Sequence, residues 1–169
     1  MKLPREPDDA ALLELGRLTW AAMNLEDVAY EIRRSLGPEP SNLARAPASE
    51  WIRDALKVLS NWQESEIRES ACRWFNAARD ALEERSSVLH SVPGTWVTVA
   101  DDGAVTTHGP VLEYIPTRRD RPFRRRSLTE GELRIVREQL ADARSGWTDI
   151  YLALHEERKR NADGDQGRG

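Results

Sequence analysis

The spacing of apolar residues predicts a long helix at the start of the chain. Between residues 9 and 36, apolar side chains recur every three or four positions. These positions are Ala11, Leu15, Leu18, Ala22, Leu25, Ala29, Ile32 and Leu36. Such spacing keeps one face of an α-helix apolar for about seven turns. Gly37 and Pro38 follow directly, a pair typical of a helix C-terminus.

Two more helices are predicted before residue 94. Residues 49–60 have an apolar face formed by Trp51, Ile52, Ala55, Leu56 and Leu59. Asn61 and Glu64 have the spacing of a capping pair and predict the start of a third helix. Its apolar face is formed by Ile67, Ala71, Trp74, Ala78, Leu82 and Val88, and Pro93-Gly94 closes the element.

The pattern then changes from helical to extended. In "TWVTVADDGAVTTHGPVLEYIP", β-branched residues flank Asp102-Gly103, which predicts a β-hairpin over about residues 95–116. Thr129 and Glu132 form a capping box for a last helix. Its apolar positions are Leu133, Val136, Leu140, Ala143, Trp147, Ile150 and Leu154.

Together these elements predict an all-α fold. We expect an antiparallel helical bundle of about four long helices, with a small β-hairpin inserted before the last helix. The bundle forms a single domain over residues 9–160. We expect a loose N-terminus over residues 1–8 and a disordered, polar and Gly-rich tail over residues 161–169.

Composition excludes several classes of protein. The 169 residues carry a net charge of −4, so bulk charge does not indicate nucleic-acid binding. The single cysteine excludes an internal disulfide framework and a Cys-based zinc site. No residues have the spacing of a metal site or a phosphate-binding loop, so we expect no metal and no cofactor. Without a signal peptide or an apolar run of roughly 20 residues, we expect a cytoplasmic protein that does not associate with membranes.

Arg85 interrupts the apolar face of the third predicted helix. It follows Ile67 by 18 residues, which is about five full turns, so both side chains point the same way. A buried guanidinium needs a carboxylate, a backbone carbonyl or an anionic ligand. Glu26, at the edge of the first helix's apolar face, is the best-placed carboxylate to support it.

His90 lies five residues beyond Arg85, about 140° around the same helix. The two side chains can meet if the helix frays near Ser86-Ser87. They can also meet across a dimer axis.

Arg85 and His90 form the pattern R-x4-H near the end of a long helix in an all-helical chain. This stretch, "EERSSVLHSVPGTW", resembles the HEPN family, whose mark is R-x4-6-H with a polar residue usually following the arginine. Ser86 occupies that polar position, where asparagine is common in the family. In the toxins that pair with nucleotidyltransferase antitoxins, a tyrosine stands two residues after the histidine. Val92 stands there in this chain.

The resemblance implies a homodimer that binds RNA and, in active members, cleaves it without a metal. Partner classes implied are RNA and an antitoxin protein. Histidine can shuttle a proton near neutral pH, and the arginine fork can bind a phosphate. Ser86 would position the scissile phosphate or orient His90. The alternative is a non-catalytic interaction or dimerisation module, in which Arg85 is a structural ion pair and His90 caps a helix C-terminus.

A basic run occupies residues 118–126, "RRDRPFRRR", with six arginines in nine residues. It comprises Arg118, Arg119, Arg121, Phe123, Arg124, Arg125 and Arg126. The arginines can bind RNA phosphates while Phe123 stacks on a base. The run can equally be a solvated linker, or pair with acidic helices of the same chain.

Overall fold

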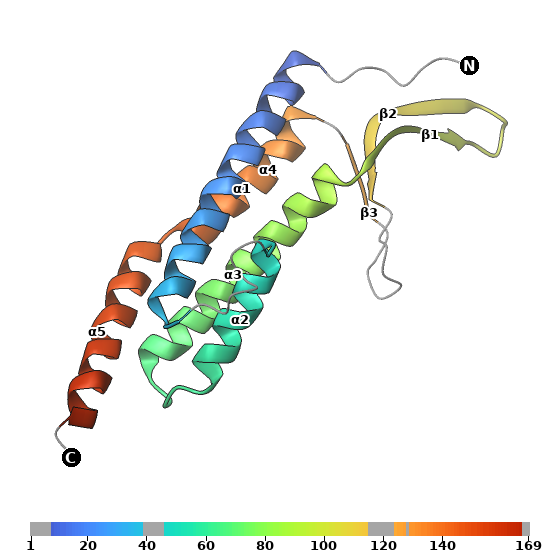
Figure 1. The fold of residues 1–169 in the computed structure, drawn as a ribbon. Helices are drawn as coiled ribbons and strands as arrows, with labels where there is room; N and C mark the ends of the chain where they lie inside the picture. The colour runs from blue at the N-terminus through green and yellow to red at the C-terminus, as the bar shows by residue number, and fades with distance from the viewer. Residues whose placement is uncertain (1–7, 39–45, 115–123, 128, 167–169) are drawn as a thin grey trace. The chain divides into compact units, whose positions relative to one another are not determined.

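The computed structural model describes residues 8–38, 46–114, 124–127 and 129–166. Within these ranges the chain forms, in order, α1 (Asp9–Ser35), α2 (Ala48–Ser60), α3 (Glu66–Leu89), β1 (Val92–Val99), β2 (Val105–Tyr114), β3 (Arg124–Ser127), α4 (Glu130–Arg144) and α5 (Trp147–Gln166) (Figure 1). The predicted all-α fold, with a small β-hairpin before the last helical region, is confirmed.

Residue contacts divide the chain into two compact units. Met1–Ala22 and Leu82–Gln139 form the first unit, and Met23–Ala81 and Leu140–Gly169 form the second. Helices α1, α3 and α4 contribute residues to both units. The sequence pattern gives no sign of this division, because the apolar faces of these helices run through it without a break.

In the second unit, α1 and α2 are held together by aromatic and ionic contacts. The ring centroids of Tyr30 and Trp51 lie 4.7 Å apart. One turn further along each helix, Arg33 binds Asp54 at 2.5 Å. These successive contacts show that α1 and α2 run in the same direction where they meet. Helices α2 and α3, joined by a short turn, run in opposite directions, as expected (Figure 1).

Fully buried apolar side chains from four helices form the core of the second unit. They include Leu25, Ile32, Ile52, Leu59, Phe75 and Leu154. Burying each such side chain contributes about 1.5–3 kcal/mol relative to leaving it in water. This burial explains why the spacing of three and four residues predicted the helices, because the apolar face of each helix packs in the core.

In the first unit, α1 and α4 lie side by side (Figure 1). Leu18 of α1 and Leu133 and Val136 of α4 are almost completely buried. Between the same helices, the carboxylate of Glu14 accepts a hydrogen bond from the Nε atom of Arg137. An ion pair, among helices with buried apolar side chains, therefore joins two segments that lie 123 residues apart in the sequence.

The β-insertion is a three-stranded antiparallel sheet in the order β1-β2-β3. The predicted hairpin turn is confirmed: Gly103 has a φ of +80°, and the N–H of Ala104 donates to the side chain of Asp102 at 2.9 Å. The register between β1 and β2 shifts between Gly94 and Trp96, which marks a bulge. β3 was not predicted, because three consecutive arginines give no strand signal.

The single last helix predicted from the sequence is two helices. Gly146 has a φ of +71°, a conformation that favours glycine and ends α4. α5 begins at once, with the N–H of Ile150 bonded to the carbonyl of Gly146 at 3.2 Å. The apolar spacing continues across the break, so periodicity alone could not reveal it.

Helix ends account for the remaining differences from the prediction. Ser65, rather than Asn61, caps α3: its hydroxyl accepts from the N–H of Arg68 at 3.2 Å. Asp8, placed in the loose N-terminus by the sequence analysis, caps α1 through the N–H of Ala11 at 2.7 Å. α5 continues over residues 161–166, where a disordered tail was predicted. No proline there prevents helical hydrogen bonding.

Candidate functional site

Arg85 lies on the last turns of α3, in the first unit. Its side chain is half-buried, and its Nε atom is hidden from solvent. The prediction that Arg85 points away from open water therefore holds for the inner part of the side chain. Ser86, the next residue, is half-buried as well.

The end of α3 is intact. The helix extends to Leu89, and the N–H of His90 still donates to the carbonyl of Ser86 at 3.0 Å, an α-helical bond. The hydroxyl of Ser87 donates to the carbonyl of Glu84 at 2.6 Å. The helix does not fray at Ser86-Ser87, so the first route by which Arg85 and His90 could meet is closed.

An intact helix keeps Arg85 and His90 apart within one chain. Residues five apart differ by about 140° in direction around the axis. His90 is exposed, whereas Arg85 is half-buried, as this divergence requires. The intact helix removes the fraying route, and a meeting of the two side chains across a dimer axis stays a prediction.

Glu26, the predicted partner of Arg85, lies on the part of α1 that belongs to the second unit. Its side chain is half-buried. Arg85 belongs to the first unit, and support of Arg85 by Glu26 stays a prediction.

Glu14, the most deeply buried carboxylate among the described residues, was not among the predicted site residues. Glu14 is 1% exposed and binds two arginines, Arg137 of α4 and Arg17 one turn further along α1, the latter at 3.3 Å. The signal was present in the sequence: Glu14 stands between Ala11 and Leu18 at the spacing of the apolar face. Arg137 likewise follows Leu133 by four residues.

The two arginines keep Glu14 ionised. Burial acts to raise the pKa of this carboxyl group, and is the largest single effect. Hydrogen bonds from Arg137 and Arg17, with their positive charge, outweigh burial and leave the pKa of Glu14 below its ordinary value. The hydrogen bond to Glu14 also raises the pKa of Arg137. This is a paired structural ion cluster, and all of it lies in the first unit.

Arg33 is a buried arginine that the sequence pattern did not single out. Arg33, on the apolar side of α1, binds Asp54 and donates to the carbonyls of Gly37 and Pro38, each at 3.3 Å. It thereby satisfies acceptors beyond the C-terminus of α1, where a positive charge is favourable. Arg33 therefore has a structural role, because its N–H groups donate hydrogen bonds to acceptors within the second unit.

The basic run lies partly outside the described residues. Arg118, Arg119, Arg121 and Phe123 fall there. Arg124, Arg125 and Arg126 form most of β3, opposite Tyr114, Glu113 and Leu112 of β2. These three arginines therefore belong to a sheet and not to a linker. Their proposed contact with RNA stays a prediction.

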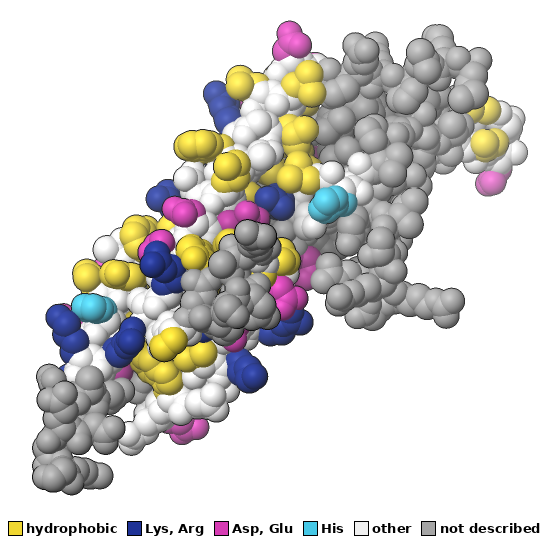
Figure 2. All heavy atoms as spheres, viewed as in Figure 1, with side chains coloured by type: hydrophobic (Ala, Val, Ile, Leu, Met, Phe, Trp, Pro, Cys, Tyr) yellow, Lys and Arg dark blue, Asp and Glu magenta, His cyan; other side chains and the backbone are white. Residues whose placement is uncertain are grey.

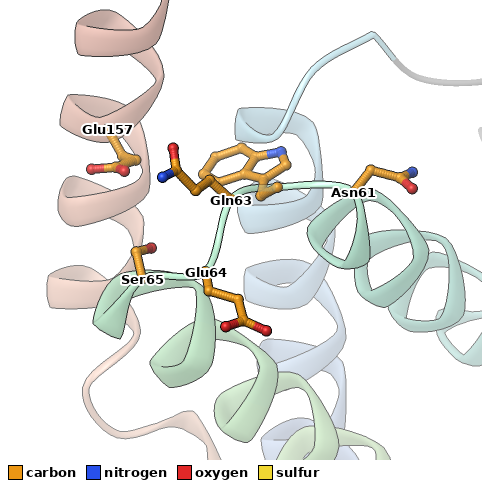
Figure 3. Close-up of a pocket in the computed structure, with 6 residues that line it drawn as sticks. Asn61, Gln63, Glu64, Ser65 and Glu157 are labelled. Atoms are coloured by element: carbon orange, nitrogen blue, oxygen red, sulfur yellow. The ribbon is translucent and has the colours of Figure 1, made fainter.

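A polar pocket of about 330 Å³ opens in the second unit, between the α2–α3 turn and α5 (Figure 3). Its lining residues are Asn61, Trp62, Gln63, Glu64, Ser65 and Glu157. Gln63 and Ser65 face Glu157, whereas Glu64 and Asn61 point away from it (Figure 3). Glu157 pairs with Arg160 at 2.7 Å, and Ser65 caps α3. The pocket contains none of the predicted site residues.

Positive and negative side chains alternate over much of the described surface (Figure 2). Among the described residues, no three or more His, Cys, Asp or Glu side chains cluster in a way that could hold a metal ion. None of the described helices is both long enough and apolar enough to cross a membrane.

Comparisons with protein families, curated proteins and solved structures give no match for this chain.

Proposed function

We propose that this protein is a HEPN-like, RNA-binding homodimer that cleaves RNA without a metal ion. Arg85 of one chain and His90 of the other form the reactive site. The proposal is supported by the R-x4-H pattern at the end of α3, by the half-buried Arg85, and by the exposed His90.

The intact end of α3 is the observation that carries the dimeric form of the proposal. Within one chain, the helical bond from His90 to Ser86 holds the imidazole and the guanidinium in different directions. A twofold axis beside this helix end would place each arginine opposite the partner's histidine. One chain alone then contains both residues but no complete site.

Each residue has a defined role in this proposal. His90 accepts the proton of a ribose 2′-hydroxyl, and the 2′-oxygen attacks the adjacent phosphorus. The bond from phosphorus to the 5′-oxygen of the next nucleotide breaks, which leaves a 2′,3′-cyclic phosphate, and the leaving 5′-oxygen takes a proton from water. Arg85 binds that phosphate and stabilises the negative charge that develops on it. Ser86 positions the phosphate through its hydroxyl. Arg124, Arg125 and Arg126 bind the RNA backbone away from the reacting atoms.

Single substitutions test the proposal. His90→Ala and Arg85→Lys should each lower RNA cleavage at least 100-fold, a loss of the size expected for a general base or a charge-stabilising group. His155→Ala and Arg79→Lys are matched controls, because both residues are helical and largely exposed. Circular dichroism checks that the variants fold. Cleavage that survives His90→Ala would refute the proposal.

A second candidate is a non-catalytic dimerisation or interaction module. The observation that favours it is a set of large apolar side chains at the surface, among them Leu12, Leu13 and Trp20. In that case, purified protein would self-associate or bind a partner while leaving RNA intact, and His90→Ala would change neither property.

A further inference from the structure

Within the first unit, α1 is apolar on two opposite sides. One side carries the buried residues Ala11, Leu18 and Ala22. The other carries Leu12, Leu13 and Trp20, which are 51%, 57% and 66% exposed. A helix with one apolar face needs one partner, and a second apolar face indicates a second partner.

The exposed residues form one continuous face. At 100° per residue, Leu12, Gly16, Trp20 and Leu13 fall within an arc of about 100°, roughly opposite the buried face. We call these four residues the outer face of α1. Hydrophobic side chains come to the surface over this part of α1 and over α4 (Figure 2). Apart from Gly16, the face consists of large apolar side chains.

Gly16 lies in the middle of the outer face and in the interior of a helix. There, glycine costs roughly 1 kcal/mol relative to alanine. The described part of the chain gives no internal reason for it: none of its atoms lies within 4 Å of the position that a Cβ atom would occupy. A helical glycine on an exposed apolar face permits another backbone to approach closely.

The outer face is symmetric about Gly16. Leu12 lies four residues before it and Trp20 four residues after it. If two copies of α1 cross antiparallel with their Gly16 residues in contact, Trp20 of each chain meets Leu12 of the other. Such a self-complementary surface is what a twofold interface requires.

We infer that the outer face of α1 is a homodimer interface, with a second copy of this chain as its occupant. Leu12, Leu13 and Trp20 present roughly 350 Å² of apolar surface per chain, at the scale of the largest patch found on typical monomers. Two copies would cover roughly 700 Å² of apolar surface. A surrounding polar rim would bring the total near the roughly 1,000 Å² of a specific interface.

The charge of Arg17, beside the outer face, is already compensated within the chain. Arg17, at the edge of the outer face, binds Glu14 of its own helix at 3.3 Å. No unpaired charge of Arg17 or Glu14 would therefore be desolvated by a second copy. The inference rests on the apolar face and does not depend on RNA cleavage or on Arg85 and His90.

Sedimentation equilibrium of the full chain tests the inference. Wild-type protein should be a dimer at about 10 µM. Trp20→Glu should weaken dimerisation roughly 100-fold or more, since large aromatic residues dominate interface energies. Gly16→Leu should weaken it as well, by separating the two backbones. Leu152→Glu is the matched control, because Leu152 is similarly exposed on α5.

The outcomes are distinct. A dimer that Trp20→Glu and Gly16→Leu convert to folded monomers supports the interface. A monomeric wild type, or a dimer that survives Trp20→Glu, overturns it. Helical circular dichroism and the melting temperature show whether each variant is folded. RNA cleavage is not part of the readout. A dimer that survives Trp20→Glu overturns this interface alone, whereas a monomeric wild type also contradicts the dimeric form of the proposed function.

Discussion

The carboxylate of Glu14 on α1 accepts a hydrogen bond from Arg137 on α4, 123 residues further along the chain. Glu14 is almost completely buried, and Arg17 binds its second oxygen. This contact joins α1 and α4 within the first unit, where both helices also carry buried apolar side chains. It is therefore the place where one polar substitution should most affect the stability of that unit.

Glu14→Gln should destabilise the fold by about 2–3 kcal/mol, because it leaves Arg137 without its charged partner at a buried position. This loss of stability is smaller than the loss expected on breaking a fully buried ion pair, because Arg137 retains some contact with water. Urea denaturation followed by circular dichroism measures the change. Arg17→Ala is the control: the side chain of Arg17 is 59% exposed, so its pairing with Glu14 should contribute less than about 1 kcal/mol. If both variants lost the same free energy of unfolding, the expectation that Glu14→Gln is the more destabilising substitution would be contradicted.

The same carboxylate predicts a pH dependence. The pKa of Glu14 is lower in the folded protein than its ordinary value of 4.5, so the unfolded chain binds the proton more readily. The stabilising contribution is complete above the ordinary pKa and is lost as pH falls through the folded-state pKa. The difference in unfolding free energy between wild type and Glu14→Gln should therefore be largest near pH 7 and shrink below pH 4.5. A difference that grows on acidification would contradict this assignment.

Arg33 provides a test in the second unit. Arg33→Met should cost about 3 kcal/mol, because it leaves Asp54 and the carbonyls of Gly37 and Pro38 without their donor. Arg34→Met, the neighbouring substitution, should change stability by less than about 0.5 kcal/mol, because the side chain of Arg34 is 56% exposed. Thermal or urea denaturation of the two variants gives the comparison. Indistinguishable variants would show that Arg33 is not the anchor of this helix end.

Gly146 tests the break between α4 and α5. Gly146→Ala should destabilise the protein by about 1 kcal/mol, because alanine is strained at a φ of +71°. Gly131→Ala is the matched control in α4, where the added methyl group meets open space and helix propensity favours alanine. If Gly146→Ala stabilised the protein, α4 and α5 would be one continuous helix.

The helices were predictable because each has an apolar face in contact with a core. The predicted start of the first helix at residue 9 matches Asp9, and the end predicted at Gly37 is close to Ser35. The periodicity of apolar residues did not predict two features, the break between α4 and α5 and the strand β3. It does not report the backbone conformation of Gly146, and three arginines give no strand signal for β3.

The candidate site was predictable only in part. Sequence spacing placed Arg85 and His90 on different sides of α3, and the helical bond from His90 to Ser86 supports that. Whether the helix frays depends on its local hydrogen bonds, which no pattern of residue types specifies. Glu14 and Arg33 were passed over because a charged residue within an apolar stripe needs a distant partner, and sequence spacing cannot identify that partner.

The most direct test of the shared Arg85–His90 site is RNA cleavage by mixed dimers. Arg85→Lys and His90→Ala proteins, each inactive alone, are unfolded together and refolded at equal concentration. Half of the dimers are then mixed, and each mixed dimer has one site with an intact Arg85 and the partner's intact His90. The account predicts that cleavage returns to about a quarter of the wild-type rate. A mixture as inactive as its two components, with mixed dimers confirmed by mass spectrometry, would contradict it.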